Sequence, residues 1–247
     1  MSQEYIIGKN PVMEAIKSER DINKILIAEG SQRGQMQQLI HLAKEANVLV
    51  QFVPKKKLDQ ITDQNHQGVL AYIAAYQYAE LDDLFKAAEQ KNEPPFFLIL
   101  DEIEDPHNLG SIMRTADSVG AHGIIIPKRR AVGLTATVAK ASTGAIEYIP
   151  VVRVTNLAQT IDELKDRGVW IAGTDASGKD DYRRLDGTIP LGLVIGSEGK
   201  GMGRLIRDKC DFLIHIPMAG KVTSLNASVA AALLMYEVYR KRNPLEG

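Results

Sequence analysis

Residues 105–114 read Asp105-Pro106-His107-Asn108-Leu109-Gly110-Ser111-Ile112-Met113-Arg114, and they join an apolar run at 96–100 to a helix-like run. The residue before a proline is driven out of the helical region, and Pro106 has no N–H for a ladder, so a strand must end here. Asn108 is then expected to cap the following helix and to leave the amides around Gly110 free for a phosphate. Arg114 lies one turn beyond Gly110 and is expected on the same side. Alone, the stretch favours a plain helix start with a surface arginine.

A second stretch, residues 191–203, shows an apolar strand pattern that runs into a loop with four glycines. It is not an ATPase phosphate loop, because Gly201 is followed by Met202 instead of the Lys-Ser/Thr pair that contacts phosphate and magnesium. Nor does the spacing of its glycines match a dinucleotide fingerprint. A plain glycine-rich turn remains open, but Glu198 is an unusual residue for a purely structural connection.

A third stretch, residues 212–228, again reads as a strand, a loop and the start of a long apolar helix. Three loops therefore follow three strands directly. Ligands of open α/β sheets bind at the carboxyl ends of the strands. The sequence predicts that the three loops form one site.

The C-terminal part of the chain alternates strand-like and helix-like runs, which indicates a mostly parallel sheet covered by helices on both faces. Strands are expected at 97–100, 123–126, 149–152, 169–173, 191–195 and 212–216, and helices at 109–119, 135–141, 157–167 and 227–239.

A smaller α/β unit is expected before it, with helices at 11–18 and 35–46 and strands at 22–28, 48–53 and 69–76. Between the two lies an acidic stretch of helical spacing that ends in the stiff pair Pro94-Pro95. We therefore expect domains at 1–76 and 96–247 with a linker at 77–95.

The amino-acid composition limits the class of protein to which this chain can belong. With 247 residues, 45% hydrophobic and 25% charged, the chain has the composition of an ordinary globular protein of one or two domains. Its single cysteine, Cys210, excludes an internal disulfide framework and a cysteine-based zinc site, and we expect no metal. No signal core or membrane-length apolar run is visible, so we expect a cytoplasmic protein without a membrane partner.

The three stretches resemble the three signature motifs of the SpoU (TrmH) branch of the SPOUT methyltransferases. Asn108, Gly110 and Arg114 match an Asn-x-Gly-x-x-x-Arg motif, and residues 196–199 match the second motif. The third is matched by residues 216–218 together with 224–228. Three motifs in order over nearly the whole chain make a chance match very improbable.

The resemblance implies S-adenosyl-L-methionine as cofactor, methylation of a ribose 2′-hydroxyl in RNA, a trefoil knot in the C-terminal SPOUT domain, and a homodimer. Residues 8–12 and 65–69 resemble the small RNA-binding domain that several SpoU-type enzymes carry. A guanosine of 23S ribosomal RNA is then the expected target. A tRNA 2′-O-methyltransferase is the first alternative, and a non-catalytic rRNA-binding assembly factor is another.

Site residues follow from the same resemblance. A ribose hydroxyl is a poor nucleophile, so the enzyme must orient it and stabilise its oxygen as the proton leaves. We expect Arg114 to do this as a fixed cation, because a guanidinium stays protonated and is a poor base. The expected catalytic group is Asn108, Arg114, Glu198, Ser224 and Asn226, and the expected cofactor-binding group is Thr174, Gly196, Ile216, Met218 and Leu225.

The charge balance is close to neutral, with 30 basic and 31 acidic residues and a net charge of −1. Basic residues nevertheless gather locally. Each cluster alone reads as solvated surface, but Lys128 to Arg130 and Arg204 lie near the expected ligand loops and are candidate phosphate contacts. RNA binding is therefore expected to be modest and sensitive to salt.

Overall fold

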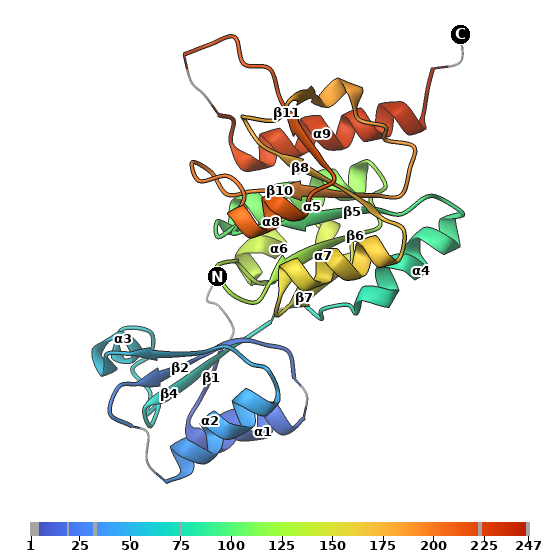
Figure 1. Cartoon of the computed structure of the whole chain (residues 1–247). Coiled ribbons are helices and arrows are strands. Elements are labelled where there is room, and N and C mark those ends of the chain that lie inside the picture. The colour runs from blue at the N-terminus through green and yellow to red at the C-terminus, as the bar shows by residue number, and fades with distance from the viewer. Residues whose placement is uncertain (1–4, 19, 32–33, 75, 222–223, 246–247) are drawn as a thin grey trace. The chain divides into compact units, whose positions relative to one another are not determined.

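The computed structural model describes residues 5–18, 20–31, 34–74, 76–221 and 224–245. It divides into two compact units, one of residues 1–77 with 133–137 and one of residues 78–132 with 138–247 (Figure 1). Each unit has its own sheet and hydrophobic core.

The first unit is a four-stranded sheet of β1 (Tyr5–Ile7), β4 (Val69–Ile73), β2 (Ile22–Ala28) and β3 (Val50–Val53), in the order β1-β4-β2-β3. Among the described residues of this unit, β2 and β3 form a parallel pair and the other two strand pairs are antiparallel. Helices α1 (Lys9–Lys17) and α2 (Gln35–Glu45) supply Val12, Met36 and Leu39 to one core, and α3 (Lys55–Asp59) supplies Leu58 to a second. The strand expected at 69–76 is shorter in the structure, because β4 ends at Ile73. Residue 75 lies outside the described residues.

The second unit is a seven-stranded sheet in the order β7-β6-β5-β10-β8-β11-β9, and all its strand pairs among the described residues are parallel. The strands are β5 (Phe96–Leu100), β6 (Gly123–Pro127), β7 (Val151–Val154), β8 (Trp170–Thr174), β9 (Asp180–Asp181), β10 (Leu191–Ile195) and β11 (Phe212–His215). Apolar runs that are buried on both faces are typical of such sheets. The expected α/β class with a mostly parallel sheet is confirmed.

Helices cover both faces of this sheet (Figure 1). Phe97 and Ile99 of β5 point into a core that α4 (Leu81–Lys91), α7 (Leu157–Asp166) and α8 (Arg204–Lys209) complete. Phe96 points the other way, where Arg242 of α9 (Ala227–Arg242) lies 5.3 Å from its ring centre. Helices α5 (Pro106–Ser118) and α6 (Ala136–Ser142) lie on that second side, and short 3-10 helices occupy 145–147 and 182–184.

This arrangement opens a crevice between two neighbouring strands. The chain leaves β5 for α5 on one face of the sheet, and it leaves β10 for α8 on the other. At such a point the connections diverge and leave room for a ligand beyond the carboxyl ends of the strands. The sheet therefore places the loops after β5 and β10 side by side.

The start of α5 differs from the prediction. Asp105, not Asn108, caps the helix, and its carboxylate accepts the His107 amide at 2.8 Å with Pro106 in the first helical position. Proline suits that position because it has no N–H to leave unpaired. Gly110 therefore lies inside the helix, where its amide has a helical partner, so the expected phosphate site at this amide was wrong. Gly110 has a packing role instead, because a Cβ on it would overlap Ala141 of α6.

The stretch 77–95 is not a free linker. It contains α4, whose Leu84 is fully buried in the core of the second unit. Gly123 of β6 leaves the space that Leu84 fills, since a Cβ there would overlap it. The acidic first turn and the Pro94-Pro95 break suggested a spacer, but an apolar helical face needs a partner and finds it here. A fragment that starts at Pro94 would lack this part of its core.

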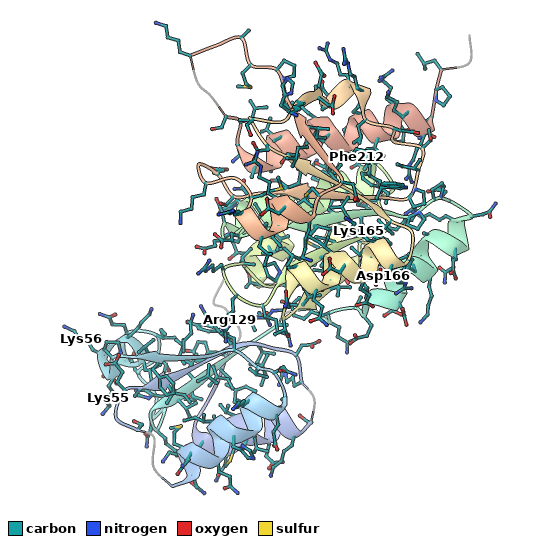
Figure 2. The ribbon with its side chains drawn as sticks, in the orientation of Figure 1. Lys55, Lys56, Arg129, Lys165, Asp166 and Phe212 are labelled. Carbon is teal, nitrogen blue, oxygen red and sulfur yellow. The ribbon has the colours of Figure 1, made fainter. Side chains whose placement is uncertain are left out.

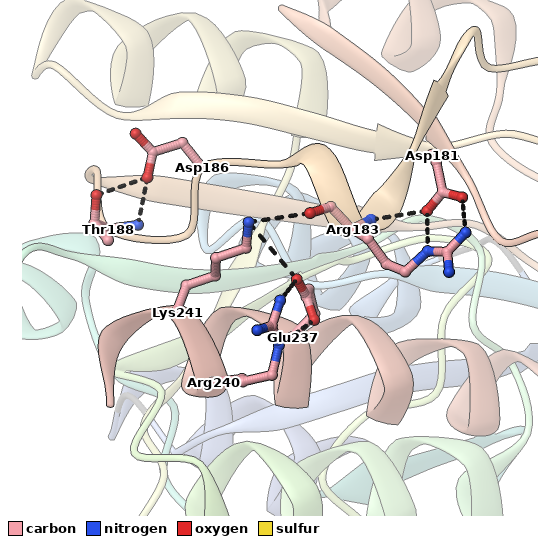
Figure 3. Close-up of polar contacts among 7 residues, drawn as sticks. All are labelled: Asp181, Arg183, Asp186, Thr188, Glu237, Arg240 and Lys241. Atoms are coloured by element: carbon pink, nitrogen blue, oxygen red, sulfur yellow. Dashed lines mark hydrogen bonds and ion pairs between the residues drawn. The ribbon is translucent and has the colours of Figure 1, made fainter. Parts of the chain in front are cut away.

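The C-terminal end of α9 is fastened to distant backbone. Arg242 donates to the carbonyl oxygens of Pro94, Pro95, Gly187 and Ile189 at 2.7 to 3.3 Å. Figure 3 shows a second attachment nearby, in which Lys241 donates to the Arg183 carbonyl at 3.0 Å. The helix is thus fixed to the segments that precede β5 and β10.

Candidate active site

A carboxylate and two carboxamides meet at the crevice. Asn108 in the first turn of α5 donates to Oε1 of Glu198 at 3.0 Å, and Asn226 donates to the same oxygen and to Oδ1 of Asn108, the latter at 3.0 Å. The backbone amide of Ala227 also donates to Glu198 Oε1, at 3.2 Å. One carboxylate oxygen thus joins α5, the loop after β10 and the start of α9.

Asn226 has a second task, as the N-cap of α9. Its Oδ1 accepts the amides of Ser228 and Val229 at 3.0 and 3.3 Å. With Oδ1 occupied by the helix, the amide nitrogen must point away from it, toward Glu198 and Asn108. The cap therefore fixes the orientation of this carboxamide.

The loop at 196–203 is closed on itself. Ser197 and Gly201 exchange two backbone hydrogen bonds at 3.1 and 2.9 Å, and Gly199 and Gly201 have φ of 79° and 68°. Gly203 donates its amide at 2.7 Å to Asp101, which follows β5. Burial raises the pKa of Asp101 and the Gly203 hydrogen bond opposes this rise. The loop is thereby held between β5 and β10.

A cavity of about 400 Å³ lies beside this loop, at the carboxyl ends of β8, β10 and β11. Its size falls in the range of small-molecule sites. Apolar side chains of Ile195, Ile214 and Ala230 line it together with the backbone-rich loop. All five expected cofactor-binding residues line the cavity, namely Thr174, Gly196, Ile216, Met218 and Leu225.

The expected catalytic residues divide into three positions. Glu198 and Ser224 line the cavity, and Asn108 and Asn226 contact Glu198 just beyond it. Arg114 is exposed on α5, and its side chain makes no hydrogen bond or ion pair with any residue that the structure describes. The Glu198 carboxylate is engaged by Asn108, Asn226 and the Ala227 amide, and it makes no hydrogen bond or ion pair with Arg114.

Two residues outside the expected catalytic and cofactor-binding groups, Asp175 and His215, also line the cavity. Asp175 accepts two hydrogen bonds from Ser177, at 2.7 and 2.6 Å, and pairs with Arg207 of α8 at 3.1 Å. Partial burial raises the pKa of Asp175, but the hydrogen bonds from Ser177 and the charge of Arg207 outweigh it and leave the pKa below its usual range. The sequence signals only Asp175, because Gly173-Thr174-Asp175 ends a strand-like run with turn residues that fit either a plain turn or a pocket wall, whereas nothing in the sequence singles out His215.

Replacement of Glu198 tests the cluster. Glu198→Ala is expected to lower the rate of the methyl transfer that the sequence resemblance implies at least about tenfold, because Asn108 and Asn226 lose their common acceptor. The free energy of unfolding should fall by only about 1–3 kcal/mol. Of the two carboxamides that lose their acceptor, only Asn108 is buried. Single-turnover rates and melting curves measure the two effects.

Glu198→Gln, which keeps one acceptor oxygen, should retain more activity, and Glu163→Ala on the exposed side of α7 is the matched control. Equal single-turnover rates for all three variants would show that Glu198 has no role in the site.

Among the residues that the structure describes, no group of three His, Cys, Asp or Glu side chains is placed to hold a metal ion. Within the same described ranges, none of the helices combines the length and apolarity needed to cross a bilayer.

The crevice and the cavity are those of an α/β enzyme that binds its ligand at the carboxyl edge of a parallel sheet. Residues 95–236 match the model of the SpoU rRNA methylase family, and residues 5–79 match that of the RNA 2′-O ribose methyltransferase substrate-binding domain. The chain is 71% identical to a Bacillus subtilis protein named as a TrmH family tRNA/rRNA methyltransferase, over 99% of both chains. The protein belongs to the SpoU (TrmH) family of RNA methyltransferases.

Solved structures agree with this assignment. The SpoU methyltransferase AviRb from Streptomyces viridochromogenes, in complex with AdoMet, matches 96% of this chain and 90% of its own with a TM-score of 0.62 and 27% identity. An AdoMet-bound rRNA methyltransferase from Sinorhizobium meliloti matches 98% of this chain and 88% of its own with a TM-score of 0.60 and 27% identity. Both matches span the two units.

Proposed function

We propose that this protein transfers the methyl group of S-adenosyl-L-methionine to a ribose 2′-hydroxyl in RNA, and that its target is a guanosine of 23S ribosomal RNA. The observation that carries the proposal is the contact between the cavity and the cluster through Glu198, which lines one and binds the other. The rRNA target is supported by the Sinorhizobium enzyme, whose match extends over both units. Such a substrate would place the protein in the cytoplasm.

The residues of the cavity fit the proposed cofactor. Apolar walls at Ile195 and Ile214 suit an adenine ring, and the loop backbone at 196–201 and the chain at 216–218 offer N–H and C=O groups to a nucleoside. Thr174, Gly196, Ile216, Met218 and Leu225 would hold it. When bound, S-adenosyl-L-methionine supplies an electrophilic methyl group.

The chain's own residues divide the remaining work. Asn108 and Asn226, fixed by Glu198, are placed to orient the ribose, and Ser224 is placed to contact the substrate at the mouth of the cavity. The cluster itself carries only the negative charge of Glu198, so it cannot stabilise a developing alkoxide alone. Arg114 is the cation on the same helix that we assign to this task, as a charge and not as a base.

The test is methylation of defined RNA. In vitro transcripts of 23S rRNA and of tRNA are incubated with radiolabelled S-adenosyl-L-methionine, and 2′-O-methyl groups are mapped. We expect label on a single guanosine of 23S rRNA and none on tRNA. Label on tRNA alone would favour a tRNA 2′-O-methyltransferase, and rRNA binding without label would favour an assembly factor.

We further propose a homodimer and the trefoil knot of the SPOUT methyltransferases for the second unit. Helix α9 is apolar on all sides over residues 229–236, yet only one side is buried in the unit, and Val229, Leu233 and Tyr236 stay exposed at 48%, 41% and 51%. A helix of this kind requires a second apolar surface, which another copy of the chain supplies symmetrically. Leu233→Asp is expected to halve the mass measured by sedimentation. A dimer that survives this change would place the interface elsewhere.

A further inference from the structure

Basic side chains gather at the carboxyl ends of β6 and β7. Lys128 and Arg129 directly follow β6, and Arg153 lies in β7. The strand order puts β6 and β7 on one side of β5, whereas β10, β8 and β11, which surround the cavity, lie on the other side. The Asn108 cluster stands between the cavity and these cations.

The basic loop is attached to the chain that leads into α5. Val132 donates its amide to the Ile103 carbonyl at 2.9 Å, and Arg130 pairs with Glu102 at 2.7 Å. The loop after β6 is therefore a neighbour of the segment that ends in Asn108. Its position relative to the cluster is fixed by backbone as well as by side chains.

The electrostatics of this edge favour an anion. The Arg153 guanidinium of β7 donates to the backbone carbonyl of Lys128, the residue that follows β6, at 3.5 Å. Partial burial, and next the charge of Arg153, lower the pKa of Lys128. Arg129 is exposed, and its side chain has no ion pair or hydrogen bond within the part of the chain that the structure describes (Figure 2). A phosphate would relieve the repulsion and partner the exposed guanidinium.

We propose that the RNA strand whose ribose enters the Asn108 cluster continues across the carboxyl ends of β6 and β7, with its phosphates on Lys128, Arg129 and Arg153. The inference rests on the proposed function and adds the direction of the RNA backbone. It excludes the opposite direction, over Arg204 at the start of α8, although the sequence named Arg204 together with Lys128 to Arg130 as candidate phosphate contacts. The cofactor side of the sheet is thus kept free of RNA backbone.

The salt dependence of RNA binding tests this direction. Each lost phosphate contact reduces the slope of log affinity against log salt concentration by about one. Binding of in vitro transcribed 23S rRNA is measured over a series of KCl concentrations for the full-length wild type, for Arg129→Gln and for Lys128→Gln with Arg129→Gln. We expect the slope to fall by about one and about two, respectively, with unchanged affinity for S-adenosyl-L-methionine.

Two matched variants make the test specific. Arg184→Gln removes an equally exposed arginine near β9, the opposite edge strand, and should leave the slope unchanged. Arg204→Gln should also leave it unchanged. An unaltered slope for the Arg129 variants, or an equal fall for Arg204→Gln, would overturn the proposed direction. Wild-type protein that binds this RNA without methylating it would instead count against the proposed function. The proposed direction of the RNA backbone would not be affected by that result.

Discussion

Replacement of Arg114 with alanine is expected to lower the rate of methyl transfer at least about 100-fold while cofactor binding survives. The three clustered side chains contribute one negative charge and two neutral amides, so the oxygen that loses its proton finds no positive partner among them. Arg114 lies on the same helix, six residues beyond Asn108 and about 9 Å along the helix axis. Its exposed guanidinium makes no hydrogen bond or ion pair with the described residues and is available to the substrate.

Lysine at this position should fail almost as completely. A planar guanidinium can hold a phosphate oxygen and the ribose oxygen at the same time, whereas an ammonium is a point charge. The measurement is a single-turnover rate with saturating cofactor, accompanied by titration calorimetry with S-adenosyl-L-methionine. Single-turnover rates close to that of the wild type for either variant would exclude Arg114 from the chemistry. Weakened cofactor binding would place Arg114 in the other part of the site.

Gly196→Ala is the second change with a large expected effect. The φ of Gly196 is not in the left-handed region, so backbone strain is not the reason. An added Cβ would come within 2.6 Å of the Gly201 carbonyl oxygen and closer still to the Gly201 carbonyl carbon and the Met202 amide. Backbone atoms on a closed loop cannot rotate away, so the loop must open. We expect the affinity for S-adenosyl-L-methionine to fall at least about tenfold, or roughly 1.4 kcal/mol.

Gly199→Ala is the matched control in the same loop. Gly199 has a φ of 79°, and a Cβ there meets no atom among its described neighbours. That change adds backbone strain without a clash and should affect the affinity less. Titration calorimetry and melting of the unliganded protein separate the two variants. If Gly196→Ala bound cofactor as tightly as the wild type, the ligand would not depend on this loop.

The sheet of the second unit was largely predictable, because most of its strands are short apolar runs, and β5, β6, β8 and β10 are each followed directly by a glycine or a charged residue. The run at 191–195 coincides with β10, and that at 123–126 is β6 without its last residue. The first and last residues of a strand were harder to predict where polar and apolar residues alternate with a proline or glycine. The strand expected at 149–152 begins two residues later, because Pro150 lies before β7.

Short polar elements carried no periodic signal. Helix α8 has six residues and follows glycines, and β9 has two, so neither shows a pattern in the sequence. The cap of α5 was misassigned because Asp105 and Asn108 are both good capping residues, and only the Pro106 geometry decides between them. The resemblance grouped Glu198 with Asn108 and Asn226, but their hydrogen bonds could not be predicted, since the two amides lie 90 and 28 residues away along the chain.

Helix α9 is held at both of its ends, by the Asn226 cap next to Glu198 and by Arg242 on four backbone carbonyls. Helix termini normally fray, and the amide protons of their end turns exchange with solvent through these small openings. Here neither end is free to unwind alone. We infer that hydrogen exchange along α9 requires a larger opening of the second unit. The amide protons of the helix are then protected from exchange to a similar degree from one end to the other.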